Sequence, residues 1–245
     1  ASTVVLPATR PIADGREIIC QSMLAIKDGT TAFTPQTPSS GPFTISAFEP
    51  GQSTLLERNP RFYGKAPAVK QIELLSIADG TARLNALRQG QVDYVSGLTP
   101  ALAQSLAGQR GLKVTASKPP YVSYMPFTMN TAVAPFTDPR VREAVKLAVN
   151  RQRIRDNVYY GLGEIGNDVP ALGFASYDTG LPLRRYDPDR AKQLLAEAGA
   201  ADASVELTVG PELPGMVETA TLIAQDLTAV GMRVTLRELP AGQLF

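Results

Sequence analysis

The chain has 245 residues, of which 44% are hydrophobic and 19% charged, and its formal net charge is +1. This length and balance are typical of a folded globular protein with a sizeable core. The charges are spread along the chain without a basic stripe, which argues against a nucleic-acid partner. No apolar run approaches the roughly 18 to 20 residues needed to span a bilayer.

Residue types that carry much of enzyme chemistry are scarce. The sequence contains no histidine and a single cysteine, Cys20. Without histidine, the commonest general base and the Ser-His-Asp and Cys-His arrangements are missing, so we expect no enzymatic activity. Cys20 cannot form an internal disulfide, and Ile18 and Ile19 beside it favour a buried, inert thiol. We expect neither a metal nor a cofactor.

The first clear structural patterns begin at Phe43. Upstream of it, the turn-rich stretch from Asp28 to Gly41 predicts a surface loop. FTISAF and STLLERN then flank Pro50-Gly51, a turn dipeptide, and predict a β-hairpin whose two strands each bury one face. QIELLSI, residues 71–77, predicts a third strand.

An alternation of helices and strands follows. Asp79 or Thr81 can cap a helix that Gly90 ends. Its apolar positions are Ala82, Leu84, Ala86 and Leu87. A short strand is expected over residues 92–95, a helix over 100–107 and a second short strand over 112–117. This order predicts an α/β layer rather than an all-β barrel.

The strongest helical pattern is PFTDPRVREAVKLAVNRQRI, residues 135–154. Asp138 can accept hydrogen bonds from the free N–H groups of a helix start, and Pro139 fits the first helical position. One apolar face then recurs at helical spacing in Val141, Ala144, Val145, Ala148 and Val149. Asn150 can cap a second short helix. Just upstream, YVSYMPFTMN, residues 121–130, predicts a strand.

The last third of the chain begins with an irregular stretch. Gly161–Leu183 has five glycines and two prolines, and so long a connection is functional or mobile. Asp187-Pro188 restarts a helix by the same cap-plus-proline device. SVELTVG, a long helix and MRVTLREL then predict a βαβ unit with a parallel strand pair. The residues of this helix expected to face the core are Val217, Ala220, Ala224 and Leu227.

Four of these blocks together resemble the family 5 solute-binding proteins of bacterial ABC importers, the oligopeptide, dipeptide and nickel binders. SSGPFTISAFEPGQSTLLERNPRFYG, residues 39–64, resembles the family's Gly-Pro-aromatic strand, Pro-Gly turn and "ERNP" strand. DGTARLNALRQGQVDYV, residues 79–95, resembles its "ATARLxALxxGxVD" block. The other two are the helix start at Pro135 and YDPDRAKQLLAEAG, residues 186–199. From their agreement in order, the chain is identified as a member of this family.

The resemblance implies an α/β fold of the two-lobed periplasmic-binding-protein type (type II, family 5). It assigns residues 1–120 to part of the first lobe, 121–130 to a strand that crosses the hinge, and 131–245 to part of the second lobe. The opening ASTVVLPATRP lacks a signal-peptide pattern. Because family members are longer, we expect the chain to be incomplete at both ends.

The candidate ligand-binding residues lie in two places. A two-lobed binder holds its ligand between the lobes, and the crossing strands act as the hinge. The first group therefore lies on or beside the crossing strand, at Tyr121, Tyr124 and Asn130. The resemblance places the second group in the following loop, at Asn167, Phe174 and Tyr177. A structural role is the alternative for each, since Asn130 can hold the turn before Pro135 and the loop aromatics can pack on their own lobe.

Arg140 and Arg142 at the start of the central helix resemble an anion clamp. A helix N-terminus is the wrong end for cations, so we expect ion pairs instead. The chain has no tryptophan, although relatives often use tryptophan in their cleft walls. This departure leaves the ligand class open.

The resemblance implies a protein that captures a small solute outside the cytoplasmic membrane and delivers it to ABC permease subunits. Its expected location is the periplasm or, as a lipoprotein, the bacterial cell surface. Peptide is the leading ligand class, because it dominates the family, and nickel chelates, opines and oligosaccharides stay open. The alternative is the effector-binding domain of a bacterial transcription regulator with the same fold.

Overall fold

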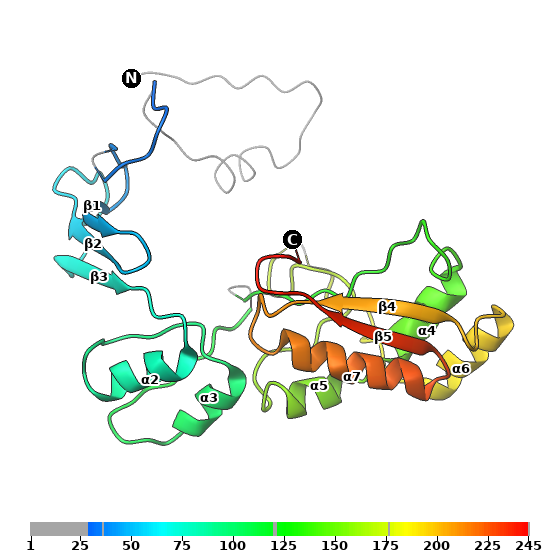
Figure 1. The fold of residues 1–245 in the computed structure, drawn as a ribbon. Helices are drawn as coiled ribbons and strands as arrows, with labels where there is room; N and C mark the ends of the chain where they lie inside the picture. Colours follow the sequence, from blue (N-terminus) through cyan, green and yellow to red (C-terminus); the bar gives the residue numbers. More distant parts are fainter. Residues whose placement is uncertain (1–28, 36, 120–121, 176, 245) are drawn as a thin grey trace. The chain divides into compact units, whose positions relative to one another are not determined.

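A computed structural model of the chain describes residues 29–35, 37–119, 122–175 and 177–244 (Figure 1). Cys20 and Tyr121 lie outside these residues, so the expectations for them stay predictions. The chain divides into two compact units, Ala1–Ala78 and Asp79–Phe245. The expected lobes, with their boundary near residue 120, also stay a prediction.

The first unit contains an antiparallel sheet of three strands in the order β1-β2-β3. The strands span Phe43–Glu49, Ser53–Arg58 and Gln71–Leu75. Gly51 adopts a φ of 73°, which glycine accepts without strain, and Gln52 N–H donates to the Glu49 carbonyl at 3.0 Å. The predicted hairpin and third strand are confirmed.

The expectation that each hairpin strand buries one face is wrong for this sheet. Ile45, Phe48 and Leu74 point to the same face by their register, yet Phe48 is 54% and Leu74 52% exposed. A sheet face is buried only when a second layer packs against it. Within the described part of this unit, residues 29–35 and 37–78, no helix or second sheet supplies that layer.

The second unit begins with two short helices, α2 (Gly80–Arg88) and α3 (Pro100–Leu106). Asp79 caps α2 by accepting from Ala82 N–H at 2.7 Å, and Thr99 caps α3. Both helices are confirmed. The strands expected over residues 92–95 and 112–117 are not formed, because no neighbouring segment pairs with their backbone.

Two helices form the corner that the strongest sequence pattern predicts, α4 (Pro139–Ala148) and α5 (Arg151–Asn157). Asp138 Oδ1 accepts from Arg140 N–H at 2.8 Å, and Asn150 Oδ1 accepts from Arg153 N–H at 2.9 Å. The predicted apolar face of α4 is buried through Val141, Ala144, Val145 and Ala148. Both caps and both helices are confirmed.

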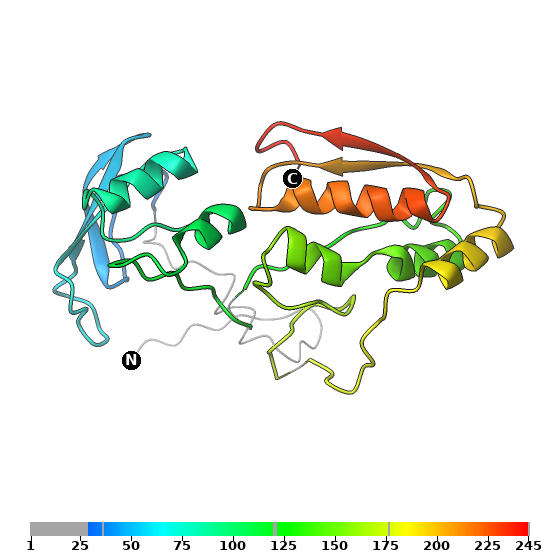
Figure 2. The same cartoon turned by 90° about the horizontal axis from the view of Figure 1, so that it is seen from below.

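The chain ends in α6 (Pro188–Glu197), β4 (Ser204–Val209), α7 (Met216–Ala229) and β5 (Arg233–Glu238). β4 and β5 pair in parallel from Ser204↔Arg233 to Val209↔Glu238, so the predicted βαβ unit is confirmed. Helix α7 lies along the strand pair and contacts α4 on its other side (Figure 2). Its buried positions are Thr219, Ala220, Ile223, Asp226 and Leu227. The expected inward residues Val217 and Ala224 are only partly buried.

One hydrophobic core joins these elements. It is built from α4, α5, α6 and α7 together with the residues that lead into β5. The largest side chains with less than 2% exposure are Leu195 and Leu227, each 0% exposed. None of the helices in the described residues has both the length and the apolar character that crossing a bilayer requires.

Candidate functional site

The expected crossing strand is an extended segment without a paired neighbour. Over residues 124–130 the side chains alternate: Met125, Phe127 and Met129 are partly buried, whereas Tyr124 and Asn130 are exposed. Phe127 and Met129 pack against the core. The alternation is that of a strand, but no described segment donates or accepts ladder hydrogen bonds along it, so the predicted strand is not formed.

Tyr124 and Asn130 lie on the outward side of this segment. Tyr124 is 66% exposed. Asn130 Oδ1 accepts from Ala132 N–H at 3.1 Å, which is the turn-holding role considered as the structural alternative. Its Nδ2 has no hydrogen-bond partner among the described residues and can still donate. Six residues of extended chain span about 20 Å, so the two side chains cannot reach one small group together.

The three loop candidates have different surroundings. Asn167 Nδ2 donates to the Pro182 carbonyl at 3.0 Å, and its Oδ1 accepts from Arg184 N–H at 2.9 Å. Both ends of this amide therefore hold the loop together. Phe174 is 50% exposed and Tyr177 is half-buried, and their N–H groups donate within the loop. The two aromatic side chains are the ones that can offer a ligand a surface.

Charged residues at the base of this loop were missed by the sequence patterns. Arg184 binds Asp168 and Glu143, and Arg151 binds Asp168 at 2.5 Å. Burial acts to lower the pKa of Arg184, but Asp168 and Glu143 hold that pKa above its usual value. These charged residues are far apart in the sequence, so their spacing does not indicate which of them form ion pairs.

The expectation of ion pairs holds for one of the two arginines at the start of α4. Arg140 Nη2 lies 2.6 Å from Asp138 Oδ2, and its Nη1 donates to the Glu197 carbonyl. The hydrogen bond from Arg140 lowers the pKa of Asp138. Arg142 instead donates to the carbonyls of Phe136 and Thr137, because its side chain folds back over the turn that leads into the helix.

Tyr159 joins the extended segment to α7. Its hydroxyl donates to Met125 Sδ at 3.5 Å and shares a 3.3 Å hydrogen bond with Thr219 Oγ1. Its ring also packs over Gly215, where a Cβ atom would come within 3.0 Å of the ring. Burial raises the pKa of the Tyr159 hydroxyl above its usual value.

A pH dependence follows from Tyr159. Because the folded-state pKa is raised, its contribution to stability is fully present below the unfolded value of about 10 and is lost as pH rises through the folded pKa. Tyr159→Phe should abolish this alkaline loss. A titration followed by absorbance at 295 nm should show, in the Tyr159→Phe variant, one tyrosine fewer among those that ionise at the highest pH. An unchanged late-titrating group in the Phe variant would contradict the assignment.

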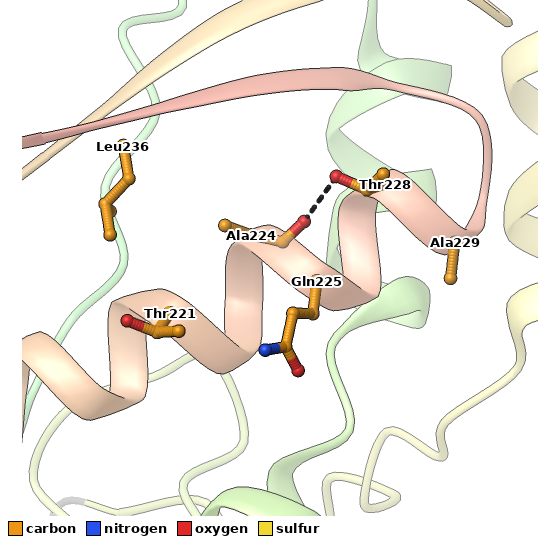
Figure 3. Close-up of a pocket in the computed structure, with 6 residues that line it drawn as sticks. All are labelled: Thr221, Ala224, Gln225, Thr228, Ala229 and Leu236. Atoms are coloured by element: carbon orange, nitrogen blue, oxygen red, sulfur yellow. Dashed lines mark hydrogen bonds between the residues drawn. The ribbon is translucent and has the colours of Figure 1, made fainter.

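A separate hollow of about 520 Å³ lies beside α7 and β5 (Figure 3). Thr228 Oγ1, in its wall, donates to the Ala224 carbonyl at 2.8 Å. The six lining residues are Thr221, Ala224, Gln225, Thr228, Ala229 and Leu236. None of them titrates, and none belongs to the two candidate groups.

The candidate groups offer contacts for a ligand. Among the described residues, no group of three or more aspartate, glutamate, cysteine or histidine side chains could hold a metal ion. The candidate groups offer aromatic faces and one free amide, which can contact a peptide or another polar solute.

The family assignment is confirmed by comparison with known proteins. Residues 3–244 match the family described as "Bacterial extracellular solute-binding proteins, family 5 Middle". This match covers nearly the whole chain, so the chain belongs to the family 5 bacterial extracellular solute-binding proteins.

Particular relatives can be named. The peptide transport periplasmic protein SapA of Salmonella typhimurium is 27% identical over 88% of this chain and 40% of its own length. The nickel-binding periplasmic protein of Escherichia coli is 32% identical over 65% of this chain and 31% of its own length. The chain thus spans about two fifths or less of the curated relatives named here.

The fold class is also confirmed. The structure of NikA from Brucella suis, in complex with Fe(III)-EDTA, superimposes with a TM-score of 0.73 at 23% identity. The match covers 89% of this chain and 47% of the NikA chain. The α/β elements described above therefore share the fold of the matched part of NikA.

Proposed function

We propose that this chain serves in an extracytoplasmic solute-binding protein that captures a small solute and delivers it to an ABC permease. The observation that carries the proposal is the family match over residues 3–244. Relatives with transport names support it, among them the peptide transport periplasmic protein SapA and the nickel-binding periplasmic protein. No named relative supports the regulator alternative.

The ligand class we propose is peptide. Asn130 keeps an Nδ2 donor, free among the described residues, that can bind a peptide carbonyl, and Tyr124 offers an exposed ring farther along the same segment. Phe174 and Tyr177 add aromatic surface from the loop. A nickel chelate would have to bring its own ligands, because the chain has no histidine to offer the metal.

The mechanism would be closure about a hinge. Open and closed forms of such a protein differ by a few kcal/mol, and a ligand that contacts both lobes shifts the population to the closed form. The segment over residues 122–130 is suited to a hinge, because no strand among the described residues forms with it the ladder hydrogen bonds that would make it rigid.

Thermal unfolding against a ligand panel tests the proposal. The panel holds di- to pentapeptides, nickel with L-histidine, opines and cello-oligosaccharides, and is applied to this chain and to any longer form that the gene encodes. A ligand at 100 times its Kd adds about 2.7 kcal/mol to the stability of the native state. For a chain of this size, that is a rise in Tm of roughly 5 to 10 °C.

Matched tyrosine variants locate the effect. Tyr124→Ala should remove most of the ligand-induced rise, whereas Tyr63→Ala should leave it intact, because Tyr63 is 88% exposed and belongs to neither candidate group. A rise confined to peptides supports the proposed ligand class, and a rise with another panel member replaces it. No rise with any panel member in either form would contradict solute binding.

A further inference from the structure

The two ends of loop 169–182 meet at one place. Asn167 and Asp168 precede the loop, and Leu183 and Arg184 follow it. Asn167 binds the Pro182 carbonyl and the Arg184 N–H with its amide. Arg184 Nε also donates to Asp168 Oδ2 at 2.5 Å. A surface loop whose ends are joined in this way has a fixed base.

Charged side chains fix these joined ends to two helices. Asp168 Oδ1 accepts from Arg151 Nη2 of α5 at 2.5 Å, and Arg184 Nη1 donates to Glu143 Oε1 of α4. Arg151 is in turn held by the Lys146 carbonyl at 3.0 Å. The four residues Asp168, Arg184, Arg151 and Glu143, here named the clasp, carry two positive and two negative charges.

Asp168 is the central member of the clasp. It lies between two guanidinium groups, and its side chain is 20% exposed. Its backbone has a φ of 62°, a left-handed conformation that aspartate tolerates better than most residues. Without the carboxylate, Arg151 and Arg184 would face each other as like charges in a partly buried site.

Beyond the clasp, the loop has few ties to the rest of the protein. The hydrogen bonds of residues 169–181, among those described, join loop residues to one another, as from Tyr177 N–H to the Phe174 carbonyl and from Phe174 N–H to the Ala171 carbonyl. None of the described residues of the loop belongs to the hydrophobic core. The loop is thus held at its base and not along its length.

We propose that the clasp is a positioning device for the ligand-binding loop. It fixes the base of loop 169–182 on α4 and α5, so that Phe174 and Tyr177 are presented from one defined place while the loop beyond the base stays free to adjust to a solute. This proposal rests on the proposed function in one respect, namely that Phe174 and Tyr177 contact a solute.

The absence of tryptophan from this chain makes the proposal easy to test. Phe174→Trp places a single tryptophan in the loop, whose fluorescence is excited at longer wavelength than that of the tyrosines. In that background, Asp168→Ala should lower the tryptophan anisotropy and speed the first chymotryptic cleavage within the loop about tenfold, because the base opens more often. Asp168→Asn should give an intermediate effect, since it keeps one acceptor and tolerates the left-handed backbone but loses the charge.

Arg190→Ala is the matched control, because it removes an exposed ion pair with Glu197 in the same unit. It should change neither readout. All measurements are made without ligand and well below the Tm of each variant. If both Asp168 variants show the same cleavage rate and the same tryptophan anisotropy as the control, the proposed role of the clasp is wrong. Because no solute is present, that result says nothing against solute binding, which the ligand panel decides separately.

Discussion

Asp226→Ala is expected to lower the free energy of unfolding by about 2 to 3 kcal/mol. The Asp226 carboxylate is buried in α7, where it accepts from Asn150 N–H at 2.9 Å and from Arg153 Nη2 at 2.6 Å. Alanine leaves both donors without this acceptor. The cost stays below the roughly 3 to 5 kcal/mol of a fully buried broken pair, because the Arg153 side chain is 34% exposed and partly screened by water.

Urea denaturation followed by circular dichroism measures this loss, with Glu197→Ala as the control. Glu197 pairs with Arg190 at 3.2 Å, and both side chains are more than 40% exposed. Its removal should cost less than about 1 kcal/mol. An Asp226→Ala variant no less stable than the control would show that the carboxylate does not connect the corner of α4 and α5 to α7.

The pH dependence of this effect has a definite sign. Burial raises the pKa of Asp226, against the opposing hydrogen bond from Asn150 and the charge of Arg153. A raised pKa means that the folded chain holds the protonated carboxyl better than the unfolded chain does, so this linked part of the stability is fully present below about pH 3.9 and is lost as pH rises through the folded pKa, whereas the hydrogen bonds to Asn150 and Arg153 remain. Asp226→Asn cannot titrate, so its stability should improve relative to the native chain as pH rises over this window.

The parts of this fold that the sequence predicts are those decided by near neighbours in the chain. Asp138, Asn150 and Asp187 cap their helices through N–H groups two or three residues away, and the structure confirms all three. The Pro50-Gly51 hairpin is equally local. In each case the donor, the acceptor and the backbone conformation are all present within one short stretch.

The missed features depend on distant partners. Residues 124–130 alternate in burial as a strand should, but strand pairing needs a neighbour that this pattern cannot specify. Asp226 binds Asn150 across 76 positions, and an aspartate in a helix is usually exposed, so the helical pattern gave no reason to place it inward. The Asn167 amide joins the ends of the loop through Pro182 and Arg184, 15 and 17 positions away, and a contact of Asn167 with a ligand stays a prediction.

Leu195→Ala is expected to have the largest effect on stability, a loss of about 3 kcal/mol within the usual range of roughly 2 to 5. Leu195 lies on α6, is 0% exposed and packs in the core that α4, α6 and α7 share. Alanine removes buried carbon atoms and leaves a cavity that closely packed neighbours fill only in part. Urea denaturation measures the loss.

Leu183→Ala is the matched control, since Leu183 is 56% exposed and should cost no more than about 0.5 kcal/mol. Equal losses in the two variants would contradict the burial of α6. Leu195→Ala also separates the core from the clasp. It weakens the whole unit without touching Asp168 or Arg184, so chymotryptic cleavage of loop 169–182 well below the Tm should keep its native rate. Faster cleavage in this variant would mean that the loop opens with the core and not at its own base.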